Sequence, residues 1–283
     1  MYRDTTVGQH SQRSSDECPE GNHNSRTTDT TGRDGRRSSN GRGLSDVLGY
    51  VIIFSIVVLS ITLLVLSGMA SLEETREDER IANAERAFDV IADNMQSLYE
   101  RNAPSRATEI DLGESEIFYA NNVSITVLDE GGDGEVLAST QLRPIELRVS
   151  SDESLVYEGG AVFRAGEEGG VMLREPPFLL DSQRVHVPLI QTTAPAIESA
   201  GSTTILLRGE STDRITHVTG DSHDDIAIEI ASPRYEIWEG HLERSESMTC
   251  TTTDESETVQ CVTEDSHDTV FVTEQRIELS LIL

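Results

Sequence analysis

Apolar residues follow three different patterns along the chain, and each pattern predicts a different structure. Residues 47–72 contain no charged side chain, and 15 of the 24 residues in 47–70 are Leu, Ile, Val or Phe. A helix of 24 residues measures about 36 Å, which is enough to cross a hydrocarbon layer about 30 Å thick. Core helices of soluble proteins are rarely apolar on every side over such a length. The segment 47–70 is therefore predicted to span a membrane.

Beyond the uncharged run, apolar residues recur at helical spacing. The seam consists of Ile81, Ala84, Phe88, Ile91, Met95 and Leu98. These steps of three and four residues place all six on one face of a helix. We therefore predict one long helix over 44–104, with the transmembrane part at 47–70 and an amphipathic stalk at 71–103. Pro104 disfavours helical geometry in the residue before it, which ends the helix. The seam packs either on the protein's own head or on neighbouring subunits, and the pattern leaves both open.

Residues 105–283 change to a period of two. Apolar and polar residues alternate in four clear segments: 122–128, 145–149, 226–230 and 276–281. Glycine-rich turns separate such segments, which is typical of many short antiparallel strands. We predict an α+β protein whose long N-terminal helix is followed by an antiparallel β-sandwich head of about ten strands. The prolines Pro176, Pro177, Pro188 and Pro195 predict a long, irregular connection in its middle third.

Charge divides the chain in two. The sequence has 22 Arg, no Lys and 51 acidic residues, for a net charge of −29. Residues 44–283 alone carry a net charge of −30, whereas residues 1–43 carry +1. So acidic a head repels nucleic acid and anionic lipid, so neither is expected as a partner. The composition resembles that of the salt-adapted proteins of haloarchaea, because it has no Lys, much Asp, Glu and Thr, and few aromatic residues. The alternative is an ordinary acidic surface protein.

The flanks of the apolar run predict its orientation. Arg33, Arg36, Arg37 and Arg42 precede it, whereas residues 73–79 are mostly acidic. Arg-rich flanks stay on the cytoplasmic side, so the C-terminal domain is expected outside the cell. No second segment is long enough to span, which predicts a single-pass protein. Residues 1–43 hold few large apolar side chains and are expected to be a disordered leader.

The residues that join leader and helix resemble a known processing signal. Residues 42–49 read Arg-Gly-Leu-Ser-Asp-Val-Leu-Gly and run straight into the apolar helix. This is similar to the class III signal peptide of archaeal type IV pilins and archaellins. The resemblance implies that a prepilin peptidase cleaves between Gly43 and Leu44, with Arg42 as the basic flank. It also implies that the freed helix packs with other pilin subunits. Residues 83–110 resemble the corresponding region of pilin-like haloarchaeal proteins.

The sequence departs from the pilin pattern near the predicted mature N-terminus. Bacterial pilins place a Glu at the fifth mature position, where it pairs with a neighbouring subunit's amino terminus. Here Leu48 occupies that position, and the nearest acid is Asp46 at the third, where haloarchaeal pilins often have Pro. The resemblance therefore supports processing better than assembly into a major filament. A minor subunit or a pilin-like anchored surface protein fits better.

Three other interpretations of the N-terminal region remain open. An ordinary secretory signal would be cut after Gly68-Met69-Ala70, but its apolar core would be unusually long. Arg36-Arg37 could belong to a twin-arginine signal, although no apolar residue follows the pair directly. The helix could also remain as an uncleaved signal anchor.

Two features suggest covalent modification outside the cell. Cys250 and Cys261 have ten residues between them in an alternating, Thr-rich segment, which favours a disulfide. Asn122 begins an Asn-Val-Ser sequon and is a candidate for N-glycosylation. Cys18, in the leader, is expected to be a free thiol.

Two acidic clusters are candidate sites for a divalent cation. The first contains Asp221, His223, Asp224 and Asp225, and the second contains Asp129, Glu130, Asp133 and Glu135. Neither has the spacing of a calcium loop, so both are predicted to be solvated loops, with no metal and no cofactor. The histidines His186, His217, His241 and His267 show no ligand spacing, and Trp238 is predicted to be a core aromatic.

Catalytic motifs are missing from the sequence. It contains no nucleophile elbow, phosphate loop, dinucleotide fingerprint or metalloprotease helix. We therefore expect a protein that is not an enzyme, and an extracellular hydrolase is the weakest hypothesis. The favoured function is a pilin-like cell-surface protein, a minor subunit of a type IV pilus-like filament. The alternative is a non-polymerising, single-pass surface binding protein.

Overall fold

The computed structural model describes residues 41–131, 134–166, 169–181, 183–195, 200–201, 204–223, 225–245, 248–263 and 267–282. Most of the predicted leader, residues 1–40, and with it Cys18, therefore lies outside the described residues. The helices are α1 (Gly41–Glu100), α2 (Tyr235–Leu242) and the short 3-10 helix η1 (Asp254–Ser256). The strands are β1 (Ser105–Asp111), β2 (Glu116–Tyr119), β3 (Val123–Asp129), β4 (Glu135–Leu142), β5 (Ile145–Arg148), β6 (Glu153–Glu158), β7 (Ala161–Gly166), β8 (Gly169–Arg174), β9 (Leu179–Leu180), β10 (Arg184–Thr193), β11 (Ala200–Gly201), β12 (Thr204–His223), β13 (Ile226–Ala231), β14 (Met248–Thr253), β15 (Thr258–Thr263) and β16 (His267–Ile282).

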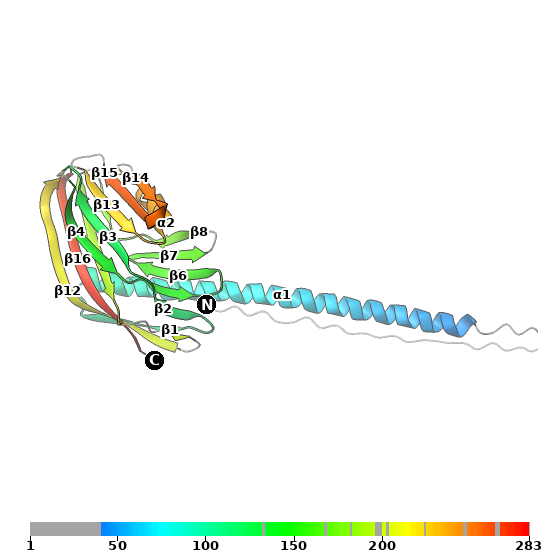
Figure 1. The fold of residues 1–283 in the computed structure, drawn as a ribbon. Coiled ribbons are helices and arrows are strands. Elements are labelled where there is room, and N and C mark those ends of the chain that lie inside the picture. Colours follow the sequence, from blue (N-terminus) through cyan, green and yellow to red (C-terminus); the bar gives the residue numbers. More distant parts are fainter. Residues whose placement is uncertain are drawn as a thin grey trace, which may run out of the picture. The chain divides into compact units, whose positions relative to one another are not determined.

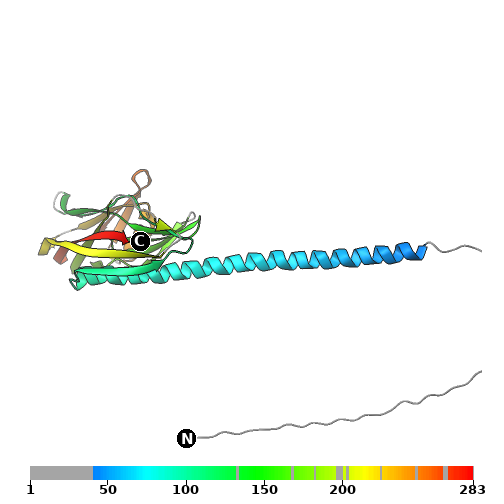
Figure 2. The ribbon, with the colours of Figure 1, turned by 90° about the horizontal axis from the view of Figure 1, so that it is seen from below.

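Helix α1 is a single unbroken helix (Figure 2). The sequence predicts a helix over 44–104, and the structure has it from Gly41 to Glu100. Its end has a clear cause: Asn102 takes a left-handed conformation with φ 53°, which Asn tolerates better than most residues. The N–H of Ala103 then reaches back to the Ser97 carbonyl oxygen at 3.2 Å. The chain consists of two compact units, and the boundary between them lies within this helix, between Thr62 and Leu63.

The strands form three sheets. Their orders are β1-β12-β16-β10-β9, β11-β2-β5-β6-β7-β8 and β14-β15-β13-β3-β4. Neighbouring strands are antiparallel except for β10 and β16, which run parallel. The predicted α+β class, with a long apolar helix and a β-rich head, is confirmed. Three sheets and one parallel pair are more than the sequence indicated, and the sandwich arrangement itself stays a prediction.

Strands β12 and β16 form the longest pair in the head and lie side by side (Figure 1). They pair antiparallel from Leu206 opposite Ile282 to His223 opposite His267, with four shifts of register on the way. Such bulges bend and twist a strand. As a result β12 contributes Leu207 to one hydrophobic core and Val218 to the other.

Two hydrophobic cores hold the head together. The first lies between α1 and strands of two sheets, and Phe88, Ile91 and Leu98 are fully buried in it. The second joins all three sheets with α2 and contains Trp238 and Phe163. The seam predicted from the sequence therefore packs on the protein's own head.

The prediction that Pro188 lies in an irregular connection is wrong. It lies inside β10, opposite Thr273 of β16. Proline lacks the N–H that a strand normally offers to a neighbour, which confines it to positions where one side needs no partner. Strand β9 pairs only with Val185 and His186 among the described residues, so β10 is free on that side at Pro188.

Candidate functional site

The described residues contain one helix that is long and apolar enough to cross a membrane, Val47–Met69, with a mean hydropathy of 2.7. It ends one residue before the predicted boundary. Its large apolar side chains are all exposed, from 44% for Val58 to 72% for Tyr50. Burying so much apolar surface is favourable, and the part of the chain that the structure describes buries none of it.

The polar residues of this helix suit an apolar environment. The hydroxyl of Ser60 donates to the Ile56 carbonyl oxygen at 2.7 Å, and that of Thr62 donates to Val58 at 2.9 Å. Hydroxyls in hydrocarbon need such internal acceptors, because an unsatisfied polar group there costs several kcal/mol. The two hydroxyls therefore make membrane insertion only slightly less favourable.

The predicted processing residues lie at the start of α1. Gly41, Arg42, Gly43 and Leu44 have helical backbones, while their side chains lie outside what the structure describes. Glycine weakens a helix by about 1 kcal/mol relative to Ala. Gly41 and Gly43 therefore add little stability to the first turn of this helix. Cleavage at the Gly43–Leu44 bond stays a prediction.

Arginines of the head bind the polar face of the stalk. Arg174 of β8 donates to Asp93 Oδ1 at 2.7 Å and to Gln96 Oε1 at 2.9 Å. Asn94 donates to Thr108 Oγ1 of β1 at 2.8 Å. Burial raises the pKa of the nearby Tyr99 phenol to about 12, with Glu100 adding to the rise. Together with the seam, these bonds fix the last turns of α1 to the head.

A glycine allows the seam to approach the sheet closely. A Cβ at Gly209 of β12 would lie 3.0 Å from Leu98 Cδ1 and 3.2 Å from Met95 Cε. Those distances are shorter than ordinary van der Waals contact. The seam is thus occupied by contacts within one molecule, and its buried residues are unavailable to a neighbouring subunit.

A buried ionic network anchors α2. Glu158 is fully buried, and its Oε2 accepts hydrogen bonds from Arg234 Nε at 2.7 Å and Nη2 at 2.5 Å. Its Oε1 accepts the indole N–H of Trp238 at 2.8 Å. Trp238 is fully buried, as a core aromatic should be, but it lies on a helix rather than on a strand. Sequence reasoning missed Glu158, because its partners lie nearly eighty residues away.

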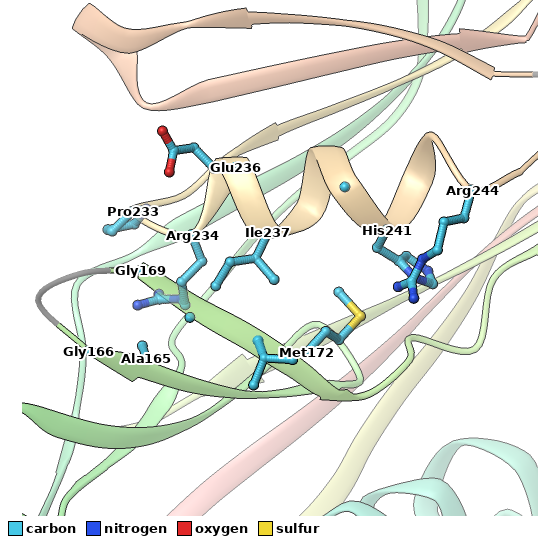
Figure 3. A pocket seen from close by; sticks show the side chains of 13 residues that line it. Ala165, Gly166, Gly169, Met172, Pro233, Arg234, Glu236, Ile237, His241 and Arg244 are labelled. Carbon is cyan, nitrogen blue, oxygen red and sulfur yellow. The ribbon is translucent and has the colours of Figure 1, made fainter.

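A groove of about 540 Å³ lies between α2 and the β7–β8 hairpin (Figure 3). Arg234, Ile237, His241 and Arg244 reach into it from the α2 side, opposite Met172 of β8. Its basic groups are already engaged. Arg234 binds Glu158, and Arg244 donates to His241 Nδ1 at 3.0 Å.

One imidazole in this groove has a shifted pKa. Burial lowers the pKa of His241, although Glu175 opposes that shift and Arg244 adds to it. The imidazole is therefore uncharged at neutral pH and accepts a hydrogen bond from an arginine. Among the described lining residues no hydroxyl or thiol stands beside it as a nucleophile. The groove has the volume for a small ligand.

The modification candidates have definite places in the head. Cys250 and Cys261 lie opposite each other on β14 and β15 and form a disulfide with an S–S distance of 2.00 Å. Asn122 is exposed just before β3, where a modifying enzyme can reach its side chain. Glycosylation stays a prediction.

The two acidic clusters meet in the structure. His223, from the first, donates through Nδ1–H to Asp129 Oδ2, from the second, at 2.7 Å. The Glu130 N–H also bonds the Asp225 carbonyl oxygen at 2.9 Å. His223 and Asp129 are largely buried rather than solvated, which corrects the expectation of two independent solvated loops. Asp133 and Asp224 lie outside the described residues, as does the Asp221 side chain; Glu135 begins β4.

Comparison with known proteins gives a family. No curated protein and no solved structure matches the chain. The profile of a family of unknown function, DUF7289, matches residues 42–280, which is most of the chain. The match begins at Arg42 and takes in the apolar segment, the stalk and the head. The chain therefore belongs to the protein family of unknown function DUF7289.

Proposed function

We propose that this chain is a pilin-like cell-surface protein, a minor subunit of a type IV pilus-like filament. A prepilin peptidase removes the leader at Gly43–Leu44. The segment Val47–Met69 then holds the protein in the membrane as a single-pass anchor, and the acidic head, in its proposed sandwich arrangement, faces the outside. This is a structural or adhesive role in a haloarchaeal envelope.

The observation that carries the proposal is the double use of α1. One end of the helix exposes an uncovered apolar surface, whereas the seam side chains from Ala84 to Leu98 are built into the core of the head. An apolar helix that is covalently continuous with a core helix transmits force between membrane or filament and head. A cleavable signal could not do this, because cleavage after Ala70 would detach the head from its anchor.

Two further observations support processing. The family match begins at Arg42, so the preceding residues are outside what the family profile covers. The Arg-Gly pair lies directly before the apolar helix, as the pilin-like signal requires. Removing a basic leader would also let the helix enter an apolar filament interior, which a retained Arg cluster would oppose.

The test is to shear cells and compare the filament fraction with the membrane fraction by quantitative mass spectrometry. A minor subunit should be released with filaments at low stoichiometry. The matched variant Gly43→Val should block processing and leave the protein in the membrane with its leader, while Gly49→Ala should be processed normally. Absence of the wild-type protein from sheared filaments would contradict the filament role.

A second function is favoured by Leu48. At the fifth mature position it offers no carboxylate to a neighbouring subunit's amino terminus. The alternative is a non-polymerising anchored protein that binds a ligand with its head. In that case Leu44 is still the mature N-terminus, but shearing leaves all of the protein in the membrane.

A further inference from the structure

Strand β12 ends and β16 begins at the end of the head away from the C-terminus (Figure 1). His223 ends β12, His267 begins β16, and the two residues are register partners. Directly opposite residues of an antiparallel pair point to the same face, with Cβ atoms about 5 Å apart. The fold thus holds two imidazoles side by side.

His267 is buried and His223 is largely buried, and each has a ring nitrogen that lacks a hydrogen-bond partner. His267 is only 1% exposed, and neither of its ring nitrogens is bonded. Nε2 of His223 and Oδ1 of Asp129 are also buried and unpaired. A buried polar atom without a partner costs about 1–3 kcal/mol, so these unpaired atoms, on two register partners and on the carboxylate bonded to one of them, call for a bound ion or water.

The contact between His223 and Asp129 sets the chemistry of the first imidazole. Its Nδ1 lies 2.7 Å from Asp129 Oδ2, where an ionised carboxylate can only accept, so Nε2 is the nitrogen left to face a metal ion. Histidines that bind metals usually donate their other N–H to a carboxylate in this way. Imidazole nitrogen is a preferred ligand of Zn²⁺, Cu²⁺ and Ni²⁺, and a chain of charge −29 attracts cations.

We propose that His223 and His267 bind one divalent transition-metal ion of the Zn²⁺, Ni²⁺ or Cu²⁺ class, with Asp129 as the positioning residue. The described residues contain no group of three or more His, Cys, Asp or Glu side chains placed to hold a metal. The site is therefore a two-imidazole site, and water fills the remaining positions. Through His223 and Asp129 the ion fastens the ends of β12 and β16 to the end of β3.

The direct test is Cu²⁺ binding to the full chain in detergent after chelator treatment, followed by electron paramagnetic resonance. Wild-type protein should bind one Cu²⁺ with two imidazole nitrogens. His223→Gln and His267→Gln should each leave one imidazole and weaken binding by at least about tenfold, and Asp129→Asn should weaken it by about tenfold. The matched control His241→Gln removes an imidazole that Arg244 occupies, and should change nothing.

Thermal unfolding gives a second readout. Zn²⁺ at about 100 times its Kd should raise the Tm of wild-type protein by about 5–10 °C and that of the double variant H223Q/H267Q not at all. If the variants do not fold, the wild-type spectrum decides. Fewer than two imidazoles on Cu²⁺, or an affinity unchanged in H223Q and H267Q, would overturn the proposal. Loss of Cu²⁺ binding in H241Q would overturn it as well.

Discussion

Glu158 and Arg234 form the most deeply buried ion pair described in the head. The carboxylate is fully buried, and the Arg234 side chain is 10% exposed. Charges removed from water need compensation, and here both carboxylate oxygens and the guanidinium are satisfied together with Trp238. The pair joins the end of β6 to the residue that directly precedes α2, so it connects two elements that are distant in sequence.

Removing the charge of Glu158 should be costly. Glu158→Gln leaves the Arg234 guanidinium buried without a counter-charge, so we expect the free energy of unfolding to fall by about 3 kcal/mol. Urea unfolding of the detergent-solubilised chain measures this. The control is Glu116→Gln, which makes the same change in an exposed pair with Arg148 and should cost less than about 0.5 kcal/mol. Equal losses in the two variants would show that the buried pair contributes no more to the free energy of unfolding than the exposed pair does.

His186 gives the head a pH dependence. Burial lowers the pKa of its imidazole in the folded state below the ordinary value of 6.5. As the pH falls, the unfolded chain therefore binds a proton at His186 before the folded chain does. The free energy of unfolding that is present above pH 6.5 is lost as the pH falls below that value. His186→Gln should lose less stability than wild type between pH about 7.5 and about 5, measured by urea unfolding. Identical slopes for the two proteins would contradict this role.

At the scale of the element, α1 depends on the head for its packing. Phe88 is fully buried in the first core, whereas Val90, two residues on, is 49% exposed. Phe88→Ala should lower the free energy of unfolding by about 3–5 kcal/mol through lost burial and a cavity. Val90→Ala on the same helix should change it by less than about 0.5 kcal/mol. If both changes were equally mild, the seam would not be a core element.

The apolar half of α1 should fail as an anchor when charged. Val58→Asp with Ile61→Asp places two carboxylates near the middle of Val47–Met69, at a total cost of about 6 kcal/mol. We expect the double variant to be extracted from membranes by alkaline carbonate, while Val58→Leu with Ile61→Leu resists extraction. Retention of the Asp variant in the membrane would mean that another part of the chain provides the attachment.

The pattern of apolar and polar residues alone predicted the elements that depend on residues close together in the sequence. Helix α1 and strands β3, β5 and β13 lie where periodicity places them, because each shows its period within a few residues. Longer-range features were missed: the parallel pairing of β10 with β16, Pro188 within a strand and the partners of Glu158. These depend on contacts between residues about eighty positions apart. Helix α2 was missed because its eight residues are too few to show a clear period.

At the scale of the whole molecule, charge separates the parts of the chain. The acidic excess lies after residue 43, where the net charge is −30, while Val47–Met69 holds no charge. Self-repulsion of this size destabilises the compact head unless cations screen it. The proposed metal site would place one cation where an imidazole pair and a carboxylate already meet.

The N-terminus of the mature protein tests the central claim most directly, because the claim requires the apolar helix to remain joined to the head. Intact-mass and N-terminal sequence analysis should be done on protein extracted from washed membranes and on protein from the medium. The account predicts a membrane-associated chain that begins at Leu44 and keeps Val47–Met69. A soluble head that begins at Ser71 would contradict it.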